Sequence, residues 1–157
     1  PGVVVLSDPR HVLVAGTGAA VWAAGKVLAA FLASHPEICR GATCLELGSG
    51  VGAVGLTAAA LGAKLVVLTD LEYQLPLLKR NQQESCPQGD RVQVRALDWR
   101  CPEHRAGLSQ WAKTWSLVLG ADVGYDPDLF DHLVGTLESQ CSTETVVYLA
   151  LADRGAE

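Results

Sequence analysis

Apolar and polar positions along this chain alternate in blocks that predict a regular succession of strands and helices. Short apolar runs rich in β-branched residues predict strands, and longer segments with apolar residues three or four positions apart predict helices. The predicted strands span residues 42–47, 64–69, 91–97, 116–121 and 145–151. The predicted helices span residues 19–34, 53–61, 71–84 and 127–140. Because the two kinds of segment alternate, we expect βαβ units around a mostly parallel sheet.

The remaining segments carry signals for turns and helix ends. Residues 3–6 and 12–14 flank a proline-containing turn, which predicts a hairpin at the start of the chain. Residues 100–113 are weakly patterned and are interpreted as a loop with a short helix. Gly62 is placed to end the second helix, and Asp126 is placed to cap the last one. In that last helix, four apolar side chains should face inward: Leu129, Leu133, Val134 and Leu137.

The final predicted strand, residues 145–151, is apolar without interruption. Such a run is typical of a strand buried on both faces of a parallel sheet. We therefore expect further strands beside it. Where those strands are missing, residues 145–151 should form an apolar sheet edge that tends to pair with other chains. The chain also begins with Pro1 rather than Met. Together these features lead us to expect a piece of a longer protein.

Composition narrows the class of protein. A length of 157 residues suits one domain, and a hydrophobic content of 49% allows a sizeable core. The net charge of −5, with scattered Lys and Arg, argues against a nucleic-acid surface, and no apolar stretch has membrane-spanning length. The five cysteines show no C-x-x-C spacing and the histidines are dispersed. We therefore expect free thiols, no metal, and a reducing location in the cytoplasm or nucleus.

The first core strand runs into a turn with three glycines at alternate positions, Gly48, Gly50 and Gly52. Glycines let a backbone approach a ligand closely, and the following helix presents free N–H groups there. With Gly55 the turn fits G-x-G-x-x-G, the dinucleotide pattern. With Glu46 it equally fits acidic-x-G-x-G-x-G, which resembles motif I of methyltransferases that use S-adenosylmethionine (SAM), where the carboxylate takes a ligand ammonium. A turn without a ligand is the third alternative.

Acidic residues follow three more predicted strands. Asp70, Asp98 and Asp122 stand at these strand ends, and Trp99 follows Asp98. Parallel sheets bind ligands beyond the carboxyl ends of their strands, so we expect these residues to converge on one rim. Asp70 can accept hydrogen bonds from the ribose of either NAD or SAM. Asp98 and Trp99 can bracket an adenine, with the acid on its amino group and the ring on its face.

Five segments, in order and spacing, resemble one known family. They are V-W at residue 21, L-E-L-G-S-G-V-G at 45, T-D-L-E at 69, L-D-W at 97 and A-D-V-G-Y at 121. The chain resembles the seven-β-strand lysine methyltransferases of the methyltransferase-like 21 family over nearly its whole length. The segments at 45 and 69 are especially similar to the members that act on the valosin-containing protein. This chain has Ala23 where the family usually has Asp, which bears on a substrate-side or supporting contact.

The resemblance implies a role for particular residues. Asp122 and Tyr125 match the D-x-x-Y motif beside the methyl group and the incoming lysine, which makes them the expected catalytic residues. Glu46 and Asp98 join the expected cofactor site from the reasoning above. The remaining expected cofactor contacts are Trp22, Gly48, Ser49, Gly50, Asp70, Leu71, Trp99 and Ala121.

The sequence therefore predicts a three-layer α/β sandwich of the SAM-dependent methyltransferase type. We expect one domain over residues 1–157, with a hairpin and helix in residues 1–36, a Rossmann-like core in residues 42–157, and a C-terminal hairpin missing. The expected activity transfers a methyl group from SAM to a lysine of a protein substrate. The alternatives are a SAM-binding interaction module without catalysis and a nicotinamide-dependent oxidoreductase. The sequence indicates no oligomeric state.

Overall fold

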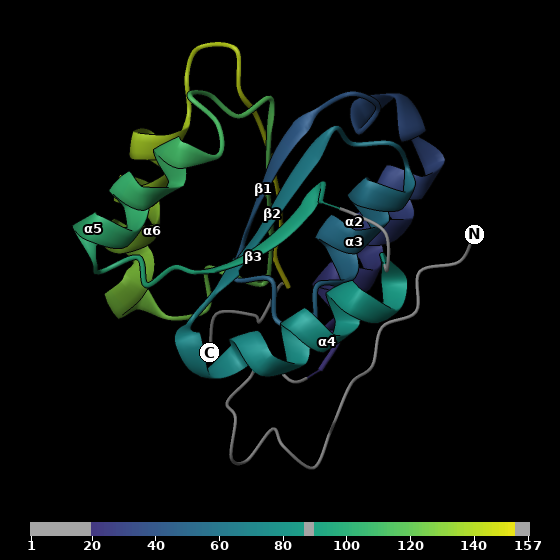
Figure 1. Ribbon diagram of the computed structural model, residues 1–157. Coiled ribbons are helices and arrows are strands. Elements are labelled where there is room, and N and C mark those ends of the chain that lie inside the picture. The colour runs from purple at the N-terminus through teal and green to yellow at the C-terminus, as the bar shows by residue number, and fades with distance from the viewer. Residues whose placement is uncertain (1–19, 87–89, 153–157) are drawn as a thin grey trace.

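The computed structural model describes residues 20–86 and 90–152, and its central feature is one parallel sheet (Figure 1). The strands are β1 (Thr43–Leu47), β2 (Leu65–Asp70), β3 (Val92–Ala96), β4 (Leu117–Ala121) and β5 (Val146–Ala150). Their order across the sheet is β3-β2-β1-β4-β5, and each neighbouring pair is parallel. The predicted parallel sheet is confirmed, and its strand order reverses direction between β1 and β4.

Helices cover both faces of this sheet, which gives the predicted three layers (Figure 1). The helices α2, α3 and α4 lie on one side of the sheet, and α5 and α6 lie on the other. Their bounds are Ala23–Ser34 for α2, Ala53–Ala60 for α3, Leu75–Ser85 for α4, Pro102–Gly107 for α5 and Phe130–Gln140 for α6. Short 3₁₀ helices occupy Pro36–Ile38, Glu72–Gln74, Leu108–Gln110 and Pro127–Leu129. No helix within the described ranges is both long and apolar enough to cross a membrane.

Each face of the sheet has its own apolar core. Leu32, Leu56 and Leu78, one from each of α2, α3 and α4, belong to the larger core. Leu133 of α6 and Trp115 belong to the core on the opposite face. Burial of such side chains contributes roughly 1.5–3 kcal/mol each, so the sheet is stabilised from both sides.

Several predicted boundaries and side-chain positions differ from the structure. The first helix begins at Ala23 instead of residue 19, and the helices predicted to begin at residues 71 and 127 each open with a 3₁₀ turn. Val134 is exposed, so the prediction that it faces inward is wrong, and Thr136 is buried in its place. The reason is that Thr136, three positions after Leu133, shares its helix face. The hairpin predicted in residues 3–14 lies outside the described residues.

Two predicted helix ends are confirmed by backbone geometry. Gly62 follows α3 with a φ of +99°, the left-handed conformation that favours glycine at helix C-termini. Asp126 accepts a hydrogen bond from the Asp128 N–H at 3.0 Å, as the predicted cap of the segment that leads into α6.

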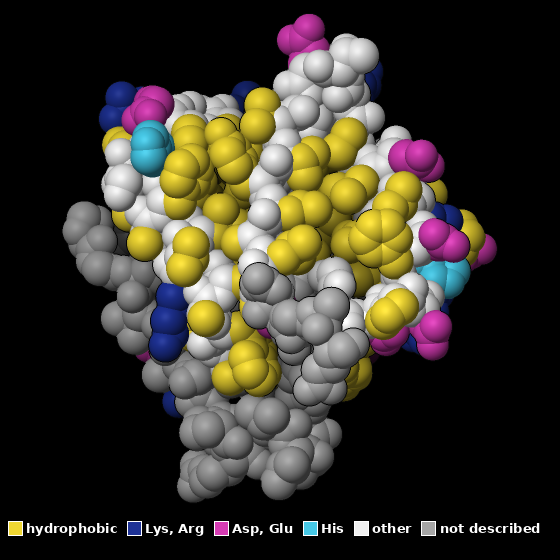
Figure 2. Space-filling view, turned by 180° about the vertical axis from the view of Figure 1, so that it is seen from behind, with side chains coloured by type: hydrophobic (Ala, Val, Ile, Leu, Met, Phe, Trp, Pro, Cys, Tyr) yellow, Lys and Arg dark blue, Asp and Glu magenta, His cyan; other side chains and the backbone are white. Residues whose placement is uncertain are grey.

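Strand β5 forms an open edge of the described sheet instead of a strand buried on both faces. It pairs with β4 on one side, and the described part of the chain provides no strand on its other side. Figure 2 views this edge and shows apolar side chains gathered over it. Exposed apolar residues come from α2, β5 with the residue after it, and α6: Val27, Phe31, Val146, Val147, Leu149, Leu151, Phe130 and Val134.

We expect this edge to drive self-association of the 157-residue chain, since an open apolar strand invites pairing with another copy. Replacing Val147 by Lys should reduce the association, because a charge on an edge strand opposes pairing. Sedimentation velocity over a range of concentrations would measure it, with Ala106→Lys on exposed α5 as the matched control. A wild-type chain that stays monomeric at every concentration would contradict the expectation.

Candidate active site

A cavity of about 340 Å³ opens at the carboxyl ends of the strands. It lies beside the point where the strand order reverses, between β1 and β4, which is where open parallel sheets bind ligands. Every residue that the sequence predicted for the site lines this cavity. They are Trp22, Glu46, Gly48, Ser49, Gly50, Asp70, Leu71, Asp98, Trp99, Ala121, Asp122 and Tyr125. The predicted convergence of the strand ends is therefore confirmed, while the role of each residue stays a prediction.

The glycine turn between β1 and α3 has the conformation that its sequence predicts. Gly48, Gly50 and Gly52 have φ values of +59°, +54° and +84°, a region that L side chains rarely adopt. At Gly48, an added Cβ would also come within 2.9 Å of a Val123 methyl group. The turn therefore needs glycine both for its backbone and for its contact with the segment that follows β4.

The Ser49 side chain fixes this turn to β2. Its hydroxyl accepts the Thr69 N–H at 3.0 Å and donates to the Glu46 carbonyl at 3.4 Å, and its own N–H donates to the Thr69 carbonyl at 2.8 Å. Ser49 is buried, so its hydroxyl serves the architecture of the turn. The Ser49 carbonyl also accepts the Gly52 N–H at 2.7 Å, so its backbone serves the turn as well.

Gly55 is the third glycine of the G-x-G-x-x-G pattern, and its packing accounts for a glycine there without a dinucleotide ligand. An added Cβ there would come within 2.6 Å of Glu46 Oε2 and would also collide with Leu68. The Gly55 N–H instead donates to that Glu46 oxygen at 3.1 Å. The glycine thus allows α3 to pack closely on the sheet, and its N–H fixes the position of the Glu46 carboxyl.

Glu46 lines the cavity although only 2% of its surface is exposed. Burial raises the pKa of its carboxyl to about 8, against the lowering effect of its hydrogen bonds with Ser49 and Gly55. The negative charge of Asp70 raises this pKa further. With this pKa the Glu46 carboxyl is largely protonated near neutral pH, and a cationic ligand group beside it would favour its ionised form.

Asp70 stands at the end of β2 and joins two backbone segments. Its Oδ2 accepts the Gly50 N–H and its Oδ1 accepts the Leu71 N–H, each at 2.7 Å. Burial raises the pKa of this carboxyl, and the two N–H bonds oppose that effect. Each carboxylate oxygen retains a further lone pair with which it can accept a ligand hydroxyl.

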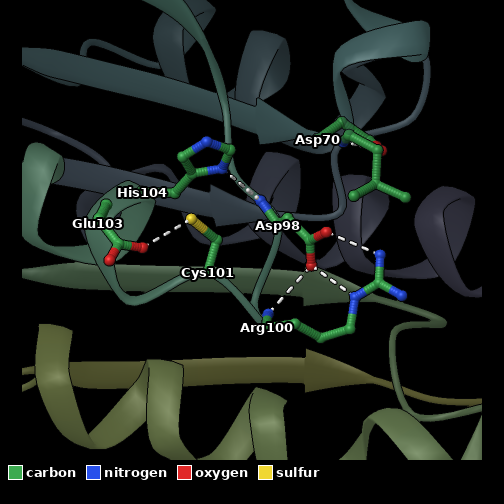
Figure 3. A network of polar contacts seen from close by, with 7 residues as sticks. Asp70, Asp98, Arg100, Cys101, Glu103 and His104 are labelled. Atoms are coloured by element: carbon green, nitrogen blue, oxygen red, sulfur yellow. Dashed lines mark hydrogen bonds and ion pairs between the residues drawn. The ribbon is translucent and has the colours of Figure 1, made fainter.

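Asp98 is held at the cavity rim by a neighbouring arginine (Figure 3). The Arg100 guanidinium donates to both carboxylate oxygens at 2.9 and 2.7 Å, and the Arg100 N–H adds a bond at 3.0 Å. These bonds hold the pKa of Asp98 at about 2. The Asp98 N–H donates to His104 Nδ1 at 3.1 Å. Sequence reasoning had not included Arg100, which carries much of the order of this rim.

Trp99 serves the core and the cavity together. The residue packs against the core cluster that includes Leu97 and Val123. Its ring also lies beside the glycine turn, with Cζ2 3.6 Å from where a Gly48 Cβ would stand. Packing against the core is thus compatible with the predicted role of Trp99 as a face for an adenine.

Asp122 follows β4 with a φ of +57°, and within the described ranges it is the one non-glycine residue with positive φ. Its N–H donates to the Ala150 carbonyl at 2.7 Å, which extends the β4–β5 pairing. Strained conformations of this kind gather at functional sites, and Asp is among the few residues that tolerate them. Because Asp126 caps the following helix, capping does not account for this placement of Asp122.

Sequence reasoning missed three polar residues on the segment after β2. Asn81 is fully buried and donates to the Val51 carbonyl of the glycine turn at 2.8 Å. Its signal was its position three residues after Leu78 on the apolar face of a helix. Tyr73 and Gln74 line the cavity from the 3₁₀ turn that precedes α4, and no sequence motif marked them.

Comparison with known proteins shows the family of this chain. A family model described as "Lysine methyltransferase" matches residues 10–157. EEF1A lysine methyltransferase 3 of Mus musculus is 37% identical over 145 residues, which cover 90% of this chain and 60% of the relative. Protein N-lysine methyltransferase METTL21A of Danio rerio is 41% identical over 137 residues, which cover 86% and 61%. The chain thus spans about 60% of the length of the curated relatives that it matches.

Solved structures agree with the fold. The magnesium protoporphyrin IX methyltransferase of Synechocystis PCC 6803, crystallised with bound S-adenosylhomocysteine (SAH), has a TM-score of 0.56 at 21% identity, covering 75% of this chain and 50% of its own. The ribosomal protein L11 methylase of Lactobacillus delbrueckii subsp. bulgaricus has a TM-score of 0.58 at 17% identity, covering 80% and 58%. At these identities the likeness shows a methyltransferase fold. With the family model matched over residues 10–157, the chain belongs to the lysine methyltransferase family.

Proposed function

We propose that this chain transfers a methyl group from SAM to a lysine side chain of a protein substrate. The observation that carries the proposal is the cavity itself, which brings the glycine turn, Glu46 and the three strand-end acids together beside the strand-order reversal. The relatives are named as methyltransferases of EEF1A lysine and of protein lysine, and these names support a protein lysine as the substrate. EEF1A is therefore the first substrate to test.

The residues present fit the chemical groups of SAM. Glu46 faces the ammonium of its amino-acid end, because a buried carboxyl is the complement of a cation. Asp70 accepts the ribose hydroxyls, with its two backbone bonds holding it in place. Asp98 and Trp99 receive the adenine, and Arg100 orients Asp98. SAM itself supplies a methyl group already activated on a sulfonium.

The chain's part in the reaction is positioning and handling of one proton. A lysine amine has an ordinary pKa of about 10.4 and must lose its proton before it can attack. The proton passes to solvent, and Asp122 would accept a hydrogen bond from the neutral amine, which orients its lone pair and stabilises the charge that develops on it. Tyr125 lines the same cavity and walls the path of the lysine.

The alternatives gain no support from the structure. The third glycine of G-x-G-x-x-G, which motivated a nicotinamide cofactor, is accounted for by the packing of Glu46 and Leu68.

A reducing location in the cytoplasm or nucleus is part of the proposal, and the five free cysteines support it.

Titration calorimetry tests the proposed cofactor. The wild-type chain should bind SAH and should show no binding of NAD under the same conditions. Asp70→Ala should weaken SAH binding about 10- to 100-fold, since it removes charge-assisted hydrogen bonds of about 1.5–3 kcal/mol each. Asp90→Ala, an exposed acid outside the cavity, is the control and should bind SAH like the wild type. Tighter binding of NAD than of SAH would reject the proposal.

A further inference from the structure

Three large aromatic side chains stand exposed around the mouth of the cavity. Trp22, Tyr73 and Tyr125 line it with 44%, 57% and 49% of their surfaces exposed. They come from three separate places: the start of α2, the 3₁₀ turn after β2 and the loop after β4. Exposed aromatic side chains that gather at one cavity indicate a contact surface for a ligand or partner.

Tyr73 shares its surroundings with the reacting side of the cavity. Burial raises the pKa of its hydroxyl, and the charge of Asp70 and the neighbouring Tyr125 hydroxyl raise it further. The hydroxyl therefore lies within electrostatic reach of both the ribose-side acid and the tyrosine of the D-x-x-Y motif. Tyr73 lines the same cavity as Asp122 and Tyr125.

The charge of the lining selects for a cation. Besides the buried Glu46, its acids are Asp70, Asp98, Asp122 and Asp126. Arg100 is the basic side chain in that lining, and it is paired with Asp98 at 2.7 Å. An acidic cavity with tyrosine rings at its mouth suits an ammonium on an aliphatic stem, because the ring faces attract the cation and the stem packs against them.

We propose that Tyr73 is a specificity-determining residue, which together with Tyr125 lines the channel for the lysine side chain of the protein substrate. This inference rests on the proposed function and deepens it. Tyr73 acts on the substrate side, so the affinity for the cofactor product SAH does not depend on it. The aromatic ring, more than the hydroxyl, carries the contact.

A two-part probe tests this without a known substrate protein. The probe is an analogue of SAH in which nitrogen replaces the sulfur and carries an arm that has an amine at the position of the lysine nitrogen, followed by a four-carbon chain in place of the lysine stem. Its reference compound carries a methyl group in place of the arm. Calorimetry should show that the wild-type chain binds the armed probe at least about tenfold tighter than the reference, which is about 1.4 kcal/mol.

Variants separate the ring from the hydroxyl and from the cofactor site. Tyr73→Ala should lose most of the gain from the arm while its affinity for SAH stays within about threefold of wild type. Tyr73→Phe should keep most of the gain, because the ring remains. Val27→Ala, an exposed apolar residue outside the cavity, is the control and should keep all of it.

Each outcome decides the inference. A full gain in Tyr73→Ala, equal losses of SAH and probe affinity, or no gain from the arm in the wild type would each overturn it. Failure of the proposed function gives a different result, because the wild-type chain would then bind neither SAH nor the reference compound.

Discussion

Replacing Glu46 by Gln should raise the melting temperature of the ligand-free protein, and the gain should grow as the pH rises from about 5 to about 8. Burial lifts the pKa of Glu46 from 4.5 to about 8 in the folded protein. The folded chain therefore keeps a proton that the unfolded chain has released, so stability falls as the pH rises between these two values. Near pH 7 this ionisation costs on the order of 3 kcal/mol, which the neutral glutamine avoids.

The glutamine preserves the contacts of the site. Its amide oxygen can accept the Gly55 N–H that Glu46 Oε2 accepts at 3.1 Å. Differential scanning calorimetry of both forms at several pH values measures the effect, with Glu138→Gln on exposed α6 as the control. An equal gain at pH 5 and pH 8, or a loss at the higher pH, would show that Glu46 is not held protonated.

Replacing Asp122 by Asn should lower the rate of methyl transfer at least about 100-fold, the scale of a lost proton-handling group. Asn tolerates the left-handed φ of +57° as Asp does, so the backbone and the side-chain shape are kept. What the substitution removes is the charge beside the amine. The affinity for SAH should stay within about threefold, because the acids proposed to hold the cofactor, Glu46, Asp70 and Asp98, are unchanged.

The neighbouring acid Asp126 provides a matched control for this experiment. Asp126→Asn also removes one charge from the cavity lining, and asparagine caps a helix as well as aspartate does. Its rate of methyl transfer to the same substrate should stay within a few-fold of wild type. If Asp122→Asn lost SAH affinity as steeply as it lost turnover, Asp122 would be a binding residue without a catalytic part.

The site could be predicted because parallel topology brings the carboxyl ends of strands together. Once residues 42–47, 64–69 and 116–121 were interpreted as parallel strands, Asp70 and Asp122 had to lie on one rim. Sequence position alone was enough for this, since each acid directly follows its strand. The observed strand order, with β1 between β2 and β4, places them around a single cavity.

Side-chain partners were not predictable in the same way. Asn81 lies on the apolar face of its helix, but its bond to Val51 depends on how α4 packs beside the turn, which the sequence does not show. The hydroxyl of Ser49 bonds to the main chain of the neighbouring strand, although its position in the motif suggested a ligand. The apolar content of β5 predicted a strand buried on both faces, whereas β5 is an open edge in the described sheet.

The position of β1 in the sheet also bears on how the chain must search for its native pairings. Thr43 of β1 pairs with Leu65 of β2, whereas Cys44, the next residue, pairs with Leu117 of β4. Closing the second, longer loop costs about 1 kcal/mol more of chain entropy than closing the first. The β2 pairing brings Asp70 to the glycine turn, while the β4 pairing brings Asp122 and Tyr125. The reacting side of the cavity thus depends on the longest-range strand pairing in the described sheet.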